Sequence, residues 1–81
     1  MRIIDTDKEQ SLRSVDLYLT VEEARIFHRN LEHLLKDPEA AEHLHINSKD
    51  HPRELSCSIF TPRKLAELPY TELERKVLSE K

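Results

Sequence analysis

The stretch LRSVDLYLTVEEARIFHRNLEHLLK, Leu12 to Lys36, decides the fold because its hydrophobic period changes at Thr20. Before Thr20, apolar residues recur at every second position: Val15, Leu17 and Leu19. This is the period of a half-buried strand, because successive side chains of a strand point to opposite faces. We therefore expect a strand from Leu12 to Leu19, and an additional short strand within Met1 to Asp5.

A helix is expected directly after this strand. In TVEE, the Thr20 hydroxyl can accept from the Glu23 amide, and the Glu23 carboxylate can accept from the Thr20 amide, which is a capping box. Pro38 limits the helix to about Lys36 or Asp37. Helical spacing gathers apolar side chains on one stripe and leaves Ile26 and His33 opposite it. The stripe comprises Val21, Ala24, Phe27, Leu31, Leu34 and Leu35.

The second half of the chain predicts a hairpin followed by helices. Leu44 and Ile46 alternate with polar residues, as do Leu55, Cys57 and Ile59 after the polar turn INSKDHPRE. Thr61-Pro62 and Thr71 are typical of helix starts. Together, residues 1–81 predict a single α+β domain. Its small antiparallel or mixed sheet of three to four strands has one long helix packed on one face and a C-terminal helix.

Composition narrows the classes of function. The chain has 81 residues, a net charge of −3, one cysteine and no glycine. Glycine-rich phosphate loops are therefore excluded, and we expect no cofactor. Mixed charges argue against nucleic acid or an anionic membrane surface as partner. No apolar run approaches the ~20 residues of a membrane span, and the start lacks a signal-peptide core, so a cytoplasmic location is expected.

The stretch HLHINSKDH raises the question of a metal site, because it holds His43, His45 and His51. Two histidines at i and i+2 on a strand can bind one ion, and nearby carboxylates could add ligands. A second ligand pair at a recognised spacing, such as HExxH or CxxC, is absent. Two interpretations of these histidines therefore remain. They are solvated or interface residues on a strand and its turn, or they bind a metal or a small ligand.

Catalysis has weaker support from the sequence. Cys57 shares the core-facing side of its strand with apolar residues, where a thiol is usually inert. His28, at the edge of the apolar stripe, could approach Cys57 to form a thiol-imidazole pair, but no orienting third group is evident. We predict no catalytic residues and a protein that is not an enzyme.

Surplus apolar surface favours an interaction protein. One helix covers one face of a sheet, so the second face needs another layer, either from the C-terminal helix or from a second chain. We expect a non-enzymatic protein-protein interaction module that acts as a homodimer and can bind a further protein partner. The expected interface residues are Tyr18, Phe60, Tyr70, Leu73 and Val77.

Three short motifs support a resemblance to known sequences. LYLTVEEA joins the expected strand and helix, LLKDPE ends the helix, and a histidine-containing strand precedes ELSCSIF. In these features, residues 16–65 resemble small uncharacterised bacterial proteins. The resemblance implies a small cytoplasmic bacterial protein and carries no activity.

Overall fold

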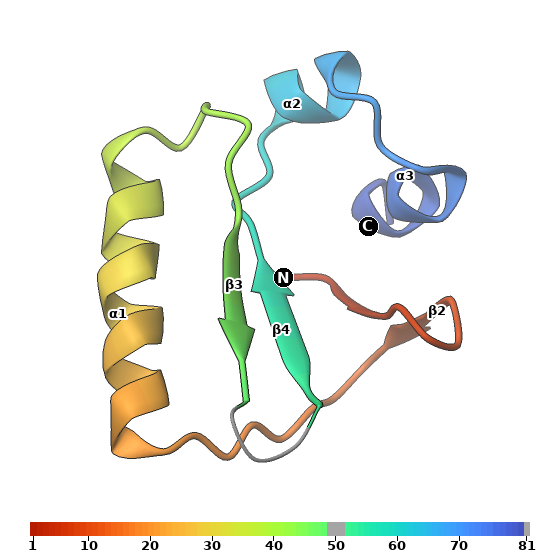
Figure 1. Cartoon of the computed structure of the whole chain (residues 1–81). Helices are drawn as coiled ribbons and strands as arrows, with labels where there is room; N and C mark the ends of the chain where they lie inside the picture. Colours follow the sequence, from red (N-terminus) through yellow and green to blue (C-terminus); the bar gives the residue numbers. More distant parts are fainter. Residues whose placement is uncertain (49–51, 81) are drawn as a thin grey trace.

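The computed structural model describes residues 1–48 and 52–80 and has an α+β fold. Seven elements follow one another along the described chain (Figure 1). They are β1 (Ile3–Asp5), β2 (Gln10–Leu12), α1 (Val21–Lys36), β3 (Leu44–Asn47), β4 (Glu54–Cys57), α2 (Pro62–Glu67) and α3 (Glu72–Leu78). The fold class expected from the sequence is confirmed.

The expected sheet of three to four strands is wrong for the described residues, because the strands form two separate pairs. β1 pairs antiparallel with β2, and β3 pairs antiparallel with β4. The second pair places Leu44 opposite Cys57 and Ile46 opposite Leu55. The period-two pattern therefore predicted this hairpin correctly but did not determine which strands join one sheet.

The strand expected from Leu12 to Leu19 is also wrong beyond its first residue. β2 ends at Leu12, and residues 13–20 form neither strand nor helix. Figure 1 shows this stretch passing the lower ends of β4 and β3 to the start of α1. An extended chain becomes a strand when a neighbour accepts its backbone hydrogen bonds, and no described strand lies beside these residues.

The β1–β2 turn closes without glycine. Glu9 takes φ 53°, a left-handed conformation that costs a residue with a Cβ atom about 1 kcal/mol or more. The Asp5 side chain supports the turn, because its Oδ1 accepts from the amides of Asp7 and Lys8, each at 3.1 Å. A short carboxylate that bonds the backbone two or three residues later is a common substitute for glycine in a turn.

α1 begins and ends where the sequence predicted, with the Thr20–Glu23 capping box formed in full. Its 16 residues give it an ordinary length rather than that of a long helix. α1 packs on the β3–β4 hairpin, where Leu34, Leu44 and Ile46 are buried. Partly buried side chains complete this core: Ile26, Phe27, Leu31, Leu55, Cys57 and Ile59.

The buried face of α1 is rotated from the expected stripe. Ile26, expected opposite the core, packs against it, whereas Val21 and Leu35 are exposed. Ile26 and Leu34 are eight residues apart and therefore share a face of the helix. Val21 and Leu35 lie on the same side of the predicted stripe, away from Ile26, and this side is outside the contact.

The C-terminal part forms two short helices, as the sequence predicted. α2 is capped by the Thr61 hydroxyl and has proline in its first turn, and α3 starts with a Thr71–Glu74 capping box. Both starts were predicted at these threonines. α3 lies against the N-terminus of its own chain, where Arg2 Nε donates to the Val77 carbonyl at 3.0 Å. No helix within residues 1–48 and 52–80 is long and apolar enough to cross a membrane.

Candidate interaction surface

An apolar stretch that runs from the loop after β2 into the first residue of α1 is exposed. Residues 15–21 carry side chains that the chain leaves largely open to solvent: Val15 49%, Leu17 50%, Tyr18 91%, Leu19 40% and Val21 70%. Exposed apolar residues are ordinary when scattered, but a contiguous group is typical of an interaction surface. We call Val15–Val21 the apolar segment.

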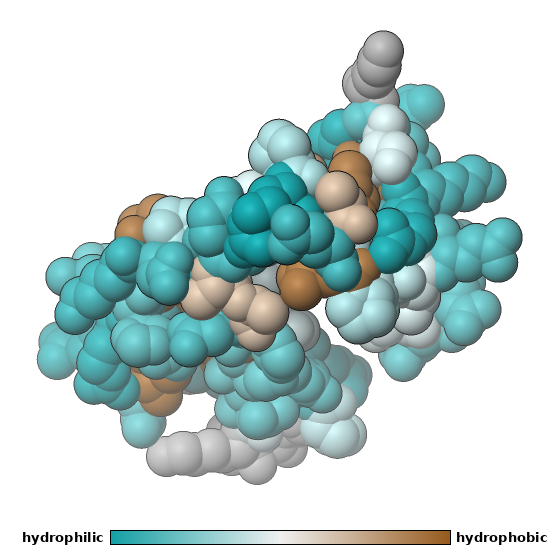
Figure 2. Space-filling model, turned by 90° about the horizontal axis from the view of Figure 1, so that it is seen from above, coloured by the Kyte–Doolittle hydropathy of each residue, from teal (hydrophilic) through white to brown (hydrophobic). Residues whose placement is uncertain are grey.

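Another face of the molecule differs from this segment. Figure 2 shows a mainly hydrophilic surface on which apolar residues form small separate patches. This agrees with a chain in which charged residues make up 36% of the sequence. The apolar segment is therefore unusual surface for this protein rather than typical of it.

The structure separates the interface residues expected from the sequence. Tyr18 lies in the apolar segment, and Phe60 is exposed between β4 and α2. Tyr70 and Leu73 are partly buried near the start of α3. In Figure 1, α3 lies far from the stretch that precedes α1, so these residues do not form one surface in a single chain.

Val77 differs from the other expected interface residues because its own chain encloses it. It retains 2% of its exposure, and the guanidinium of Arg2 bonds the carbonyls of Val77 and Glu80. The sequence left open whether the C-terminal helix packs within its chain or across a dimer. In the single chain this helix contacts the N-terminal residues, and Val77 is buried there.

His33, His43 and His45 lie on an exposed polar part of the surface beside the β3–β4 hairpin. His43 and His45 lie edge to face with ring centroids 4.5 Å apart. His45 Nδ1 lies 2.7 Å from Glu54 Oε1 across the hairpin, and His33 Nε2 lies 3.3 Å from Glu42 Oε2. Both pairs are largely solvent-exposed.

An open hollow of about 480 Å³ lies beside these imidazoles. Its lining comprises Asn30, His33, Leu34, Ala41, Glu42, His43, Leu44 and His45. His51, the third histidine of the expected site, lies outside the described residues. Within the described part, no group of three or more His, Cys, Asp or Glu side chains is arranged to hold a metal ion.

The possible thiol-imidazole pair receives no support from the contacts. Cys57 is partly buried against the α1 core, whereas His28 is exposed. No hydrogen bond joins these two side chains in the part of the chain that the structure describes. The interpretation of Cys57 as a small core side chain agrees with its place in the cluster.

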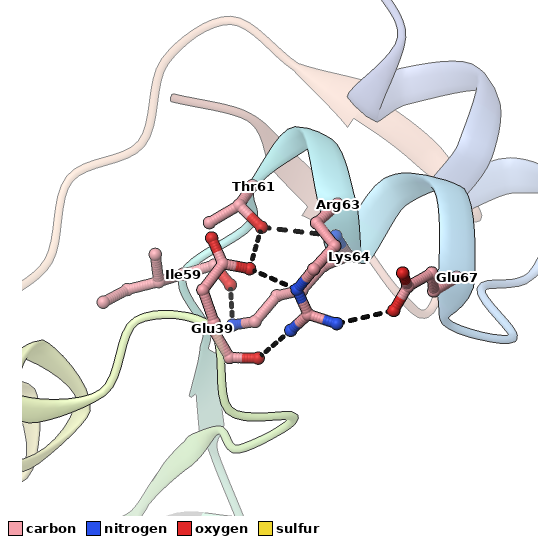
Figure 3. Close-up of polar contacts among 6 residues, drawn as sticks. All are labelled: Glu39, Ile59, Thr61, Arg63, Lys64 and Glu67. Atoms are coloured by element: carbon pink, nitrogen blue, oxygen red, sulfur yellow. Dashed lines mark hydrogen bonds and ion pairs between the residues drawn. The ribbon is translucent and has the colours of Figure 1, made fainter.

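Sequence reasoning missed a cluster centred on Glu39, which connects the loop after α1 to α2 (Figure 3). Glu39 Oε2 accepts from the Thr61 hydroxyl at 2.8 Å and from Arg63 Nε at 2.9 Å. Arg63 also bonds Glu67 Oε2 at 2.6 Å, one helical turn later. The sequence could have indicated the Arg63–Glu67 pair from its i, i+4 spacing, but not the distant Glu39.

The electrostatics of this cluster favour the charged forms. The hydrogen bond from Thr61, followed by those from Arg63, holds the pKa of Glu39 below its usual value. Bonds to Glu39 and Glu67 raise the pKa of Arg63. Next to them, Lys64 is buried, and its Nζ donates to the Ile59 carbonyl at 2.7 Å. The cluster holds α2 in place and contains no unpaired reactive group.

Comparisons with known proteins add no assignment. No family model matches the chain, and neither curated proteins nor solved structures give a match. Any function must therefore be argued from the residues and their geometry.

Proposed function

We propose that this protein is a non-enzymatic protein-protein interaction module that acts as a homodimer. The exposure of the apolar segment supports this proposal most directly. Burying a leucine or valine side chain that is otherwise exposed contributes roughly 1.5–3 kcal/mol. Several such side chains lie together in the segment. The free energy gained when a partner covers them would therefore be a substantial fraction of the unfolding free energy of a small domain.

The size of the internal core supports the same proposal. In the α1–hairpin core only Leu34, Leu44 and Ile46 are buried among the described apolar residues. Domains of this length hide a smaller share of their surface than larger ones and often gain stability from association. A two-fold dimer is the commonest such association.

Two variants of the apolar segment test the proposal. Val15→Glu and Leu17→Glu place a charge on side chains that are already exposed, so each monomer should keep its fold. Light scattering after size exclusion should show a dimeric wild type and monomeric variants, with unchanged helical circular dichroism. Lys8→Glu, which changes an exposed residue of the β1–β2 turn, is the matched control and should remain dimeric. Folded variants that stay dimeric would contradict an interface at the segment.

The alternative is metal or small-ligand binding by His43 and His45, with His33 nearby. The hollow beside these imidazoles favours it, as does the contact of His45 Nδ1 with Glu54, which leaves Nε2 available. A carboxylate at one imidazole nitrogen is a common support for a ligating histidine. Calorimetric titration of tag-free protein with zinc should then show binding that His45→Ala removes and His28→Ala retains. No heat of binding in the wild type would contradict this alternative.

A further inference from the structure

The side of the core next to β4 is incompletely covered. On β3, Leu44 and Ile46 are buried, whereas their partners across the hairpin, Cys57 and Leu55, are only partly buried. α1 packs mainly on β3, which explains the difference. β4 also has one edge without a paired strand among the described residues. A further strand beside β4 would cover these side chains and bond the open edge.

The apolar segment has the pattern that such a strand requires. Val15, Leu17 and Leu19 would all point to one face of an extended strand, and Asp16 and Tyr18 to the other. In the single chain, these residues have no strand partner among the described residues. Side chains on the first face would lie next to Leu55 and Cys57 and extend the core under α1.

We propose that residues 15–19 of one copy pair with the free edge of β4 in a second copy, and that the exchange is reciprocal. Each hairpin becomes a three-stranded sheet whose third strand comes from the partner. The inference rests on the proposed function, because it specifies how the homodimer forms. Addition of a strand to an open edge is a recurrent mode of recognition, in which backbone bonds give affinity and alternate side chains give specificity.

The connection to α1 favours a second copy over the same chain. Thr20 alone separates Leu19 from α1, and its capping box fixes the start of the helix. Figure 1 shows α1, β3 and β4 in that order, so the free edge of β4 lies beyond β3 as seen from α1. Neighbouring strands are ~4.8 Å apart, whereas one residue spans at most ~3.6 Å. Thr20 alone is therefore too short to connect a strand at this edge of β4, beyond β3, to the start of α1 in the same chain. A second copy reaches this edge with α1 and its cap intact.

The native cysteine gives a direct test. In this arrangement Cys57 faces one of Val15, Leu17 or Leu19, and side chains directly opposite on neighbouring strands can form a disulfide. We would make Val15→Cys, Leu17→Cys and Leu19→Cys separately and treat each full-length protein with diamide. Asp16→Cys is the matched control, because residue 16 points to the opposite face of the same strand. Adding Cys57→Ser to each variant shows whether Cys57 takes part.

We expect at least one of the three variants to give a covalent dimer on a non-reducing gel, at several times the yield of Asp16→Cys, and to lose it with Cys57→Ser. A disulfide between these positions within one chain would overturn the inference, because it would show that residues 15–19 lie beside β4 of their own chain. Light scattering on the same samples before oxidation distinguishes the remaining outcomes. If light scattering shows dimers but no disulfide to Cys57 forms, the strand exchange is overturned and the homodimer is not. If light scattering shows monomers and no disulfide to Cys57 forms, both the strand exchange and the homodimer are overturned.

Discussion

The Thr61 hydroxyl donates a hydrogen bond to Glu39 Oε2 at 2.8 Å, and thereby joins the loop after α1 to the residue that caps α2. The two residues are 22 positions apart in the sequence. The same hydroxyl accepts from the Lys64 amide at 3.2 Å, so one side chain caps the helix and anchors it. This contact makes the position of α2 sensitive to the charge of Glu39.

Glu39→Gln should reduce the dependence of stability on acid. The folded state lowers the pKa of Glu39 through Thr61 and then Arg63, so ionised Glu39 favours folding. This contribution is complete above the ordinary pKa of about 4.5 and is lost as the pH falls through the lower pKa of the folded state. Urea unfolding between pH 7 and pH 3 measures it.

Relative to wild type, Glu39→Gln should be less stable at pH 7, and the difference should shrink at pH 3. Glu32→Gln, on an exposed position of α1, is the control and should follow the wild-type profile more closely. A constant difference between Glu39→Gln and wild type across the whole range would show that the Glu39 charge does not contribute.

Two adjacent leucines of α1 provide a test of the core. Leu34 is buried against β3, whereas Leu35 is 61% exposed. Leu34→Ala should destabilise the protein by about 2–5 kcal/mol, because it removes apolar burial and leaves a cavity. Leu35→Ala should change stability by less than about 0.5 kcal/mol. Thermal unfolding followed by circular dichroism measures both changes in stability. Equal losses of stability in the two variants would contradict a buried face of α1 that includes Ile26 and Leu34 and excludes Leu35.

Glu9→Gly should stabilise the β1–β2 turn. Glu9 adopts φ 53°, which glycine takes without a steric cost, although glycine also loses more backbone entropy on folding. The net gain should be about 0.5–1 kcal/mol, measured as a higher urea midpoint at unchanged slope. Lys8→Gly, at the preceding turn position, should give no gain. A lower midpoint for Glu9→Gly would contradict the left-handed turn.

Local elements of the fold could be predicted because short-range chemistry specifies them. Thr20, Thr61 and Thr71 each accept from an amide three residues later, and these contacts depend on neighbouring residues alone. The hairpin of β3 and β4 could be predicted from its alternation. The assembly of strands into one sheet could not, because pairing between distant strands depends on contacts that a period-two pattern does not encode.

The candidate surface was only partly predictable for the same reason. Tyr18 was expected at an interface and is exposed, but Val15, Leu17 and Leu19 were assigned to a core-facing strand. Their alternation predicted a half-buried strand, but in the single chain these side chains are exposed. Sequence periodicity indicates an apolar face and does not say whether the same chain or another chain covers it.

The most direct test of the homodimer is the absolute mass of tag-free wild-type protein by light scattering after size exclusion, over a range of concentrations and with and without a chelator. We predict twice the single-chain mass of 9.6 kDa at the upper concentrations, unchanged by the chelator. The mass of a single chain at every concentration would contradict the homodimer. A dimer that dissociates on chelation would instead favour metal binding by the histidines.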